Sequence, residues 1–146
     1  MEKFTDVIAG SEKVLRLVPQ KPPMVMLDKL YYSDEEGTGT GLTITKENIF
    51  TKNGQFTEPG IVEHMAQAIA IRVGYYYDSI GKPAPTGYIG AIKNLVIYRL
   101  PKVNEEIRTE IKILHEILGV TIVAVRATCN GQLVAETELK TVLEKK

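Results

Sequence analysis

A carboxylate and an amide lie one helical turn apart in a stretch of sequence that is otherwise apolar. Glu63 and Gln67 both fall within residues 61–77, the most apolar part of the chain. Side chains four residues apart share one face of a helix. Burying a carboxylate costs free energy unless the group is ion-paired, hydrogen-bonded or has a functional role. One such role is that of a general acid or base. A structural role is the alternative: Glu63 would then favour the positive end of the helix dipole and reach solvent.

Small residues continue the line that these two side chains begin. At 3.6 residues per turn, Glu63, Gln67, Ala70 and Gly74 form one narrow stripe, polar at its start and small thereafter. The stripe predicts a carboxylate that faces a pocket with room for a slim ligand. The helix start, at Gly60, offers free backbone N–H groups that can hold a thioester carbonyl as negative charge develops on it. We therefore predict that Gly60 and Gln67 bind substrate, although for Gln67 alone a structural role is the simpler interpretation.

The other candidates for chemistry are two histidines and one cysteine. His64 points about 100° round the helix from Glu63, so we expect it to face a neighbouring strand or a partner chain, with a catalytic role as the less favoured alternative. His115 falls on the apolar face of its strand and is predicted to be a buried, hydrogen-bonded core residue. Cys129 is predicted to be a packed thiol, because no histidine adjoins it. Two separated histidines and one cysteine do not suit a zinc site, and no metal or cofactor is expected.

Composition narrows the classes of function. The 146 residues fit one domain, residues 1–146, and are 44% apolar and 25% charged, an ordinary globular balance. The formal net charge is zero and no long basic block occurs, so we expect neither a nucleic-acid nor a membrane partner. The first ten residues lack the basic start and apolar run of a signal peptide. The single cysteine suits a reducing compartment, and we expect a cytoplasmic protein.

The first half of the chain is predicted to hold the helix that carries the stripe. A short helix capped by Ser11 precedes the prolines at 19, 22 and 23, and strands are predicted over residues 24–32 and 38–45. Residues 48–58 are expected to form a loop. The long helix runs from about 60 to 79 and ends before Gly81. It is apolar on nearly every face, so we expect protein to surround it.

The second half is predicted to be four strands, over residues 88–100, 105–118, 120–129 and 133–143. Asn130 and Gly131 are typical of a two-residue hairpin turn. Gly90 marks a small, close-packed point that a ligand can approach, which makes it a predicted substrate-binding residue. Because short turns join the last strands, a parallel α/β fold does not fit. The sequence predicts an α+β fold in which a curved antiparallel sheet wraps around the long helix.

Four segments resemble, in the same order, motifs of the bacterial β-hydroxyacyl-acyl carrier protein dehydratases. The segment VEHMAQAIA at 62–70 resembles the E-x-MAQ central helix of that family. The segment LVPQKPPMVMLD at 17–28 is similar to the family's LPHRxPxLLxD. The segment YIGAIKN at 88–94, with Pro101 and NEE at 104–106, is similar to F-x-G-I-x-x-x-x-F-x-x-P-x-x-P-G-D. The segment NGQLVAETEL at 130–139 is similar to DGKLVAEAEL. The Pro-Pro-Met start, and a loop with no HFPG close before the helix, resemble the divergent branch found in aryl-polyene and related pigment pathways.

This resemblance implies a hot-dog fold and a mechanism that needs two chains. In the family, a glutamate that matches Glu63 works opposite a histidine of the partner chain across a dimer interface. One group removes the α-proton, and the other helps the β-hydroxyl to leave as water. The acyl chain lies in a tunnel between helix and sheet. The implied substrate is a thioester of acyl carrier protein or CoA in fatty-acid or polyene-type biosynthesis, and the implied state is a homodimer or higher oligomer.

The family histidine is missing from this sequence. The region before the helix reads Glu-Asn-Ile-Phe-Thr at residues 47–51, and Asn48 is the nearest polar match. Asparagine cannot act as a base near neutral pH, so we expect a dehydratase that is slow or inactive alone. One alternative is a hot-dog thioesterase, which can work with a single carboxylate and an activated water. Another is a non-catalytic acyl-binding subunit of a heterodimer whose hot-dog partner supplies the histidine.

Overall fold

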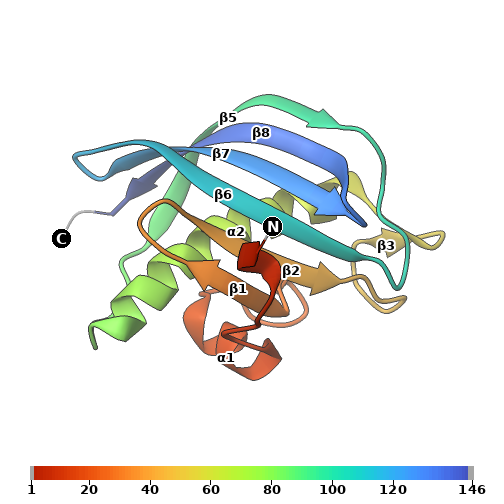
Figure 1. Ribbon diagram of the computed structural model, residues 1–146, viewed down its shortest axis with the longest axis horizontal. Coiled ribbons are helices and arrows are strands. Elements are labelled where there is room, and N and C mark those ends of the chain that lie inside the picture. The colour runs from red at the N-terminus through yellow and green to blue at the C-terminus, as the bar shows by residue number, and fades with distance from the viewer. Residues whose placement is uncertain (1, 145–146) are drawn as a thin grey trace.

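A six-stranded antiparallel sheet curves around one long helix in the computed structural model, which describes residues 2–144. Figure 1 shows helix α2 running across one face of the sheet. The strand order is β1-β2-β6-β7-β8-β5. The elements are η1 (Glu2–Phe4), α1 (Ser11–Leu17), β1 (Lys29–Ser33), β2 (Gly37–Thr43), β3 (Thr51–Lys52), β4 (Gln55–Phe56), α2 (Glu58–Ser79), β5 (Gly87–Ile97), β6 (Glu106–Ile117), β7 (Val120–Cys129) and β8 (Gln132–Leu143). The predicted α+β arrangement is confirmed.

Strands β7 and β8 form the hairpin that the sequence predicts. Cys129 pairs with Gln132 across the turn, and the register continues to Val120 opposite Val142. The two turn residues, Asn130 and Gly131, have φ angles of 51° and 77°. Positive φ at both central positions is what the tight hairpin turn requires, and asparagine and glycine adopt it at low cost.

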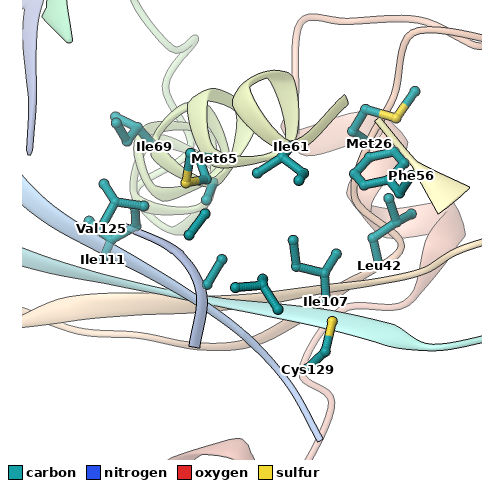
Figure 2. Close-up of a cluster of buried hydrophobic side chains, with 14 of the residues drawn as sticks. Met26, Leu42, Phe56, Ile61, Met65, Ile69, Ile107, Ile111, Val125 and Cys129 are labelled. Atoms are coloured by element: carbon teal, nitrogen blue, oxygen red, sulfur yellow. The ribbon is translucent and has the colours of Figure 1, made fainter. Parts of the chain in front are cut away.

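The core lies between α2 and the concave face of the sheet. Figure 2 shows Ile61, Met65 and Ile69 pointing from the helix toward the sheet, where Ile107 and Ile111 face them. Burying each such side chain contributes about 1.5–3 kcal/mol. Protein covers the helix only in part, however. Its remaining small and branched residues, Val62, Ala66, Ala70 and Val73, are half-buried in the single chain.

Helix α1 packs directly on the backbone of α2. A Cβ atom added to Gly74 would lie 1.8 Å from the carbonyl oxygen of Leu17. Around this contact, Val14, Leu30 and Ile71 form a second buried apolar cluster. The close approach thus fixes the chain that leaves α1 against the C-terminal half of the long helix.

The two edges of the sheet differ in what covers them. At the β1 edge, the backbone N–H and C=O of Leu30 both bond to Ala9, with N···O distances of 2.9 and 3.2 Å. At the other edge, β5 pairs with β8 alone among the strands that the structure describes. The apolar side chains of β5 are exposed there: Tyr88 by 56%, Ile92 by 46% and Val96 by 42%.

Three local predictions are wrong in the first half of the chain. Ser11 is the first helical residue and not the cap; Gly10 occupies the cap position and makes no side-chain cap bond. The strand predicted over residues 24–32 begins only at Lys29, because side chains of α2 bond the backbone before it. The predicted loop contains the short β3–β4 hairpin, which turns at Asn53 and Gly54 with positive φ.

Two predictions in the second half are also wrong. The register of β6 against β7 shifts between Ile113 and His115. After this bulge, the side chains of β6 point to the opposite face of the sheet from the one that strict alternation predicts. His115 is therefore exposed and not a core residue. Gly90 is exposed at a bulge in β5, and an added Cβ would meet nothing closer than 3.6 Å, so the point is not close-packed. None of the helices within residues 2–144 combines the length and the apolar character of a membrane-spanning segment.

The contact at Gly74 generates a stability prediction. Gly74→Ala is expected to lower the free energy of unfolding by about 1–3 kcal/mol, because the methyl group would overlap the Leu17 carbonyl and force the helices apart. The matched control is Gly90→Ala, where the added methyl makes only ordinary contacts. Urea denaturation of both variants checks this. Equal stability of Gly74→Ala and the parent protein would show that the two helices do not depend on this contact.

Candidate active site

The Glu63 carboxylate lies in the second turn of α2 and is half-buried. The helix begins at Glu58, two residues earlier than predicted, with Pro59 in its first turn. The Gln67 amide donates a hydrogen bond of 2.8 Å from Nε2 to Oε2 of Glu63. This is the one hydrogen bond that the described part of the chain gives the carboxylate. The helix thus brings together the pair that the spacing predicts, and it leaves Oε1 available to a ligand.

Gln67 is held in place by the extended segment that crosses the helix. Its side chain is fully buried. Oε1 accepts a hydrogen bond of 2.6 Å from the backbone N–H of Met26, and Nε2 donates one of 2.8 Å to the carbonyl of Met24. With both N–H groups of the amide used, the side chain cannot rotate without losing partners. Gln67 therefore supports the structure and also fixes the direction of the Glu63 carboxylate.

His64 bridges the same segment and the sheet. The ring is fully buried, with Nδ1 2.8 Å from the Met26 carbonyl oxygen and Nε2 2.7 Å from Oγ1 of Thr109 on β6. A carbonyl can only accept, so Nδ1 carries the proton and Nε2 accepts from the Thr109 hydroxyl. Burial lowers the pKa of His64 to about 4, although the Met26 carbonyl opposes the shift. His64 faces a neighbouring strand, as predicted, and neither ring nitrogen is free for a substrate.

Asn48 lies near this group but does not touch Glu63. Its Oδ1 accepts a hydrogen bond of 2.8 Å from the backbone N–H of Phe50, and its Nδ2 lies 3.3 Å from the sulfur of Met26. Asn48 and Gln67 both contact Met26, and Gln67 in turn bonds to Glu63. Within one chain, these contacts make Asn48 a loop-closing residue.

The two predicted glycine sites differ in position. Gly60 is buried in the first turn of α2, where a Cβ would lie 2.6 Å from side-chain atoms of Phe50 and Phe56. Glycine is therefore required there for packing, and its N–H is one of those that find no partner inside the helix. Gly90 lies in the exposed β5 edge, away from the other candidates; its neighbour Ile89 reaches the groove described next.

An apolar groove of about 380 Å³ runs beside α2, between the helix and the start of β5. Ala66, Ala70 and Val73 line its helical side. Ala66 lies one turn after Glu63 on the same side of the helix, but Glu63 itself is not among the residues that line the groove. Its volume lies within the range of ligand-binding clefts. The small residues of the stripe, Ala70 and Gly74, thus border a groove, whereas its polar residues Glu63 and Gln67 do not line it.

Two parts of the site escape the sequence analysis. Thr109 could have been found, because its strand alternates and places it on the apolar side with Ile107 and Ile111, where a hydroxyl needs a partner. The contribution of Met24 and Met26 carries no sequence signal. They bond to α2 through backbone atoms, which every residue offers.

Comparisons with known proteins agree with this geometry. The model of the ApeP-like family, described as ApeP dehydratase, matches residues 12–145. The chain is 30% identical over 152 residues to the 3-hydroxyacyl-[acyl-carrier-protein] dehydratase FabZ of Clostridium botulinum strain Okra, covering 99% of this chain and all of that relative. It is 29% identical over 141 residues to FabZ of Aeromonas hydrophila, covering 89% and 90%.

Solved structures confirm the hot-dog fold. The dehydratase heterocomplex ApeI:P from Xenorhabdus doucetiae aligns with a TM-score of 0.83 at 17% identity, covering 91% of each chain. A hypothetical thioesterase from Streptococcus pneumoniae with coenzyme A aligns with a TM-score of 0.64 at 10% identity, covering 80% of this chain and 85% of that one. At these identities the likeness concerns the fold.

The buried histidine generates a prediction about acid stability. An unfolded chain binds a proton at His64 near pH 6.5, whereas the folded protein does so only near pH 4. The free energy of unfolding is expected to fall as the pH drops through this window, with a contribution from His64 of about 3 kcal/mol that is complete below pH 4. His64→Gln should be less stable than the parent at pH 7 and lose this part of the pH dependence.

Denaturant unfolding at several pH values between 7.5 and 4 measures the effect. His115→Gln is the matched control, because it removes the exposed histidine and should keep the slope of the parent protein. A constant difference in stability between His64→Gln and the parent across the whole range would contradict the assignment of a neutral, buried ring.

Proposed function

The chain belongs to the ApeP-like dehydratase family, and from this membership we propose that it dehydrates β-hydroxyacyl thioesters of an acyl carrier protein in fatty-acid or polyene-type biosynthesis. The observation that carries the proposal is the half-buried Glu63 carboxylate, which Gln67 orients on the same helix that borders an apolar groove. A cytoplasmic location is part of the proposal. It agrees with Cys129, a buried free thiol whose pKa burial raises to about 11, so that it stays protonated and unreactive.

The reaction needs an acid and a base on one substrate. A base takes the α-proton, the bond between the β-carbon and its hydroxyl oxygen breaks, and a carbon–carbon double bond forms while the hydroxyl leaves with a proton as water. Glu63 is proposed to perform one of these two proton transfers. The free N–H groups at the start of α2, with that of Gly60 among them, are suited to hold the thioester carbonyl as it gains negative charge.

The second proton-transfer group is proposed to come from another chain. Within residues 2–144, Glu63 has no titratable side chain as a hydrogen-bond partner, and His64 has no free nitrogen. The exposed apolar edge of β5 supports a second chain paired there, since an open strand edge with large apolar side chains invites pairing. The start of β5 also lines the groove, so a chain at this edge would lie against the site.

We propose that this second chain is a different hot-dog protein that supplies the missing histidine. Asn48 at the matching position of this chain cannot take a proton near neutral pH, so a homodimer would carry two incomplete sites. The similarity to one chain of a structure described as a dehydratase heterocomplex favours the heterodimer. A homodimer or larger homo-oligomer remains the alternative assembly.

Thioester hydrolysis is the second candidate function. It is favoured by the single Glu63 carboxylate, one oxygen of which has no hydrogen-bond partner within residues 2–144 and can activate a water molecule. The products separate the two reactions: dehydration gives an enoyl thioester, whereas hydrolysis releases a free thiol. A thiol signal without enoyl product from a β-hydroxyacyl thioester would replace the first proposal with the second.

Replacement of the carboxylate tests the proposed function. Glu63→Gln is expected to reduce enoyl formation from a β-hydroxyacyl carrier protein by about 10²- to 10⁴-fold, the usual contribution of a general acid or base. The matched control is Glu58→Gln, which removes an exposed carboxylate from the first turn of the same helix. Product is measured by mass spectrometry of the acylated carrier, with the second hot-dog chain present. Equal rates for Glu63→Gln and the parent would remove Glu63 from the mechanism.

Restoring the missing base tests the need for a second chain. Asn48→His is expected to raise dehydration by the purified chain alone by at least about tenfold, because imidazole can accept the proton that an amide cannot. Asn53→His, at the exposed tip of the β3–β4 hairpin, is the control. The same carrier assay without any partner measures the gain. A well-folded Asn48→His variant with no gain would show that position 48 is not where the base belongs.

A further inference from the structure

Thr109 lies on the sheet but is bonded to the helix that carries Glu63. Its hydroxyl donates a hydrogen bond of 2.7 Å to Nε2 of His64, and both side chains are fully buried. Nδ1 of the same ring donates to the Met26 carbonyl oxygen at 2.8 Å, so the ring is held at both ends. The hydrogen bond that one ring nitrogen accepts decides that the other carries the proton. The Thr109 hydroxyl therefore keeps Nδ1 as the donor to Met26.

Met26 is in turn bonded to α2 through both of its backbone polar groups. His64 holds its carbonyl, and Oε1 of Gln67 accepts a hydrogen bond of 2.6 Å from its N–H. Met26 is 1% exposed, so water does not compete for these groups. Gln67 then donates to Oε2 of Glu63 at 2.8 Å. A series of hydrogen bonds, interrupted only by the backbone of Met26, thus joins the Thr109 hydroxyl to the carboxylate.

This series is sensitive to the loss of its first member. Without the Thr109 hydroxyl, Nε2 of a fully buried ring would have no partner, which is unfavourable. A ring that is bonded at one end only can turn about that bond, and the Met26 carbonyl would no longer have a fixed donor. Any movement of Met26 is passed to Gln67, which orients Glu63. A displacement of about 1 Å in a reacting group can lower a rate by about 10²-fold.

We propose that Thr109 is a positioning residue, which holds the direction of the Glu63 carboxylate through this series of hydrogen bonds. Thr109 is fully buried, so its effect reaches the reaction through its neighbours and not through contact with the substrate. The inference rests on the proposed function in one respect, namely that Glu63 performs a step of the reaction. It applies equally to dehydration and to hydrolysis.

Removal of the hydroxyl alone tests this inference. Thr109→Val is expected to lower kcat about tenfold with little change in KM, because the carboxylate loses its direction while the substrate-binding surface is unchanged. Thr109→Ser keeps a hydroxyl at this position and should recover most of the rate. The rates are measured with an acylated carrier protein and with the second hot-dog chain present.

Thr40 offers a matched control. It pairs with Thr109 across β2 and β6 and is equally buried, but its hydroxyl has no hydrogen-bond partner within residues 2–144. Thr40→Val therefore makes the same substitution in the same part of the core without breaking a bond to the helix. It should keep the kcat of the parent protein.

Hydrogen exchange at the Gln67 side chain provides a measurement that needs no substrate. The Gln67 amide group donates to Glu63 and to the Met24 carbonyl. Exchange of its protons with solvent, followed by NMR in the assembled protein, should be slow in the parent protein and in Thr40→Val. It should be at least about tenfold faster in Thr109→Val, because Gln67 loses a fixed partner.

The outcomes separate this inference from the proposed dehydration. Unchanged exchange in Thr109→Val would overturn it, as would an unchanged kcat in a parent protein that turns over substrate. Equal losses of kcat in Thr109→Val and Thr40→Val would overturn it too, since they would show a general effect of removing a buried hydroxyl. If the parent protein forms no enoyl product, faster exchange confined to Thr109→Val would uphold the inference and reject the dehydratase function.

Discussion

The site depends on the burial of polar side chains on α2 beneath an extended segment that forms no strand. Gln67 and His64 bond the backbone of Met24 and Met26, and Gln67 in turn orients Glu63. Buried amide and imidazole groups must be satisfied, and so must the backbone groups that they meet. Helix and segment therefore fix one another. The Glu63 carboxylate takes its direction from this arrangement.

Much of the fold could be predicted because its signals are local. Alternation along β6 and β8, the Asn130–Gly131 turn and the apolar run of α2 each depend on residues near one another in sequence. The bulge that exposes His115 depends on the register between β6 and β7. The sequence of either strand alone does not determine that register. The same limit applies to residues 24–28, whose β-like composition is overridden by hydrogen bonds from a helix about 40 residues further along the chain.

Part of the candidate site could likewise be predicted from the sequence, and part could not. The pair Glu63 and Gln67 follows from helical spacing, and the groove follows from the small residues beyond it. The groups that hold the pair are backbone atoms and have no signature in residue type. Within residues 2–144, Glu63 has no titratable side chain as a hydrogen-bond partner, and a sequence that lacks a group cannot indicate where that group comes from. The resemblance to the family implies that a histidine is missing, which the residues of this chain alone do not indicate.

The two edges of the sheet offer unequal templates for a further strand. Residues 8 and 9 occupy the hydrogen-bonding groups of Leu30 in β1, whereas among the described strands β5 pairs with β8 alone. An added strand therefore finds an interrupted row of backbone N–H and C=O groups at β1 and a continuous one at β5. The N-terminal segment thus biases a partner chain toward the β5 edge.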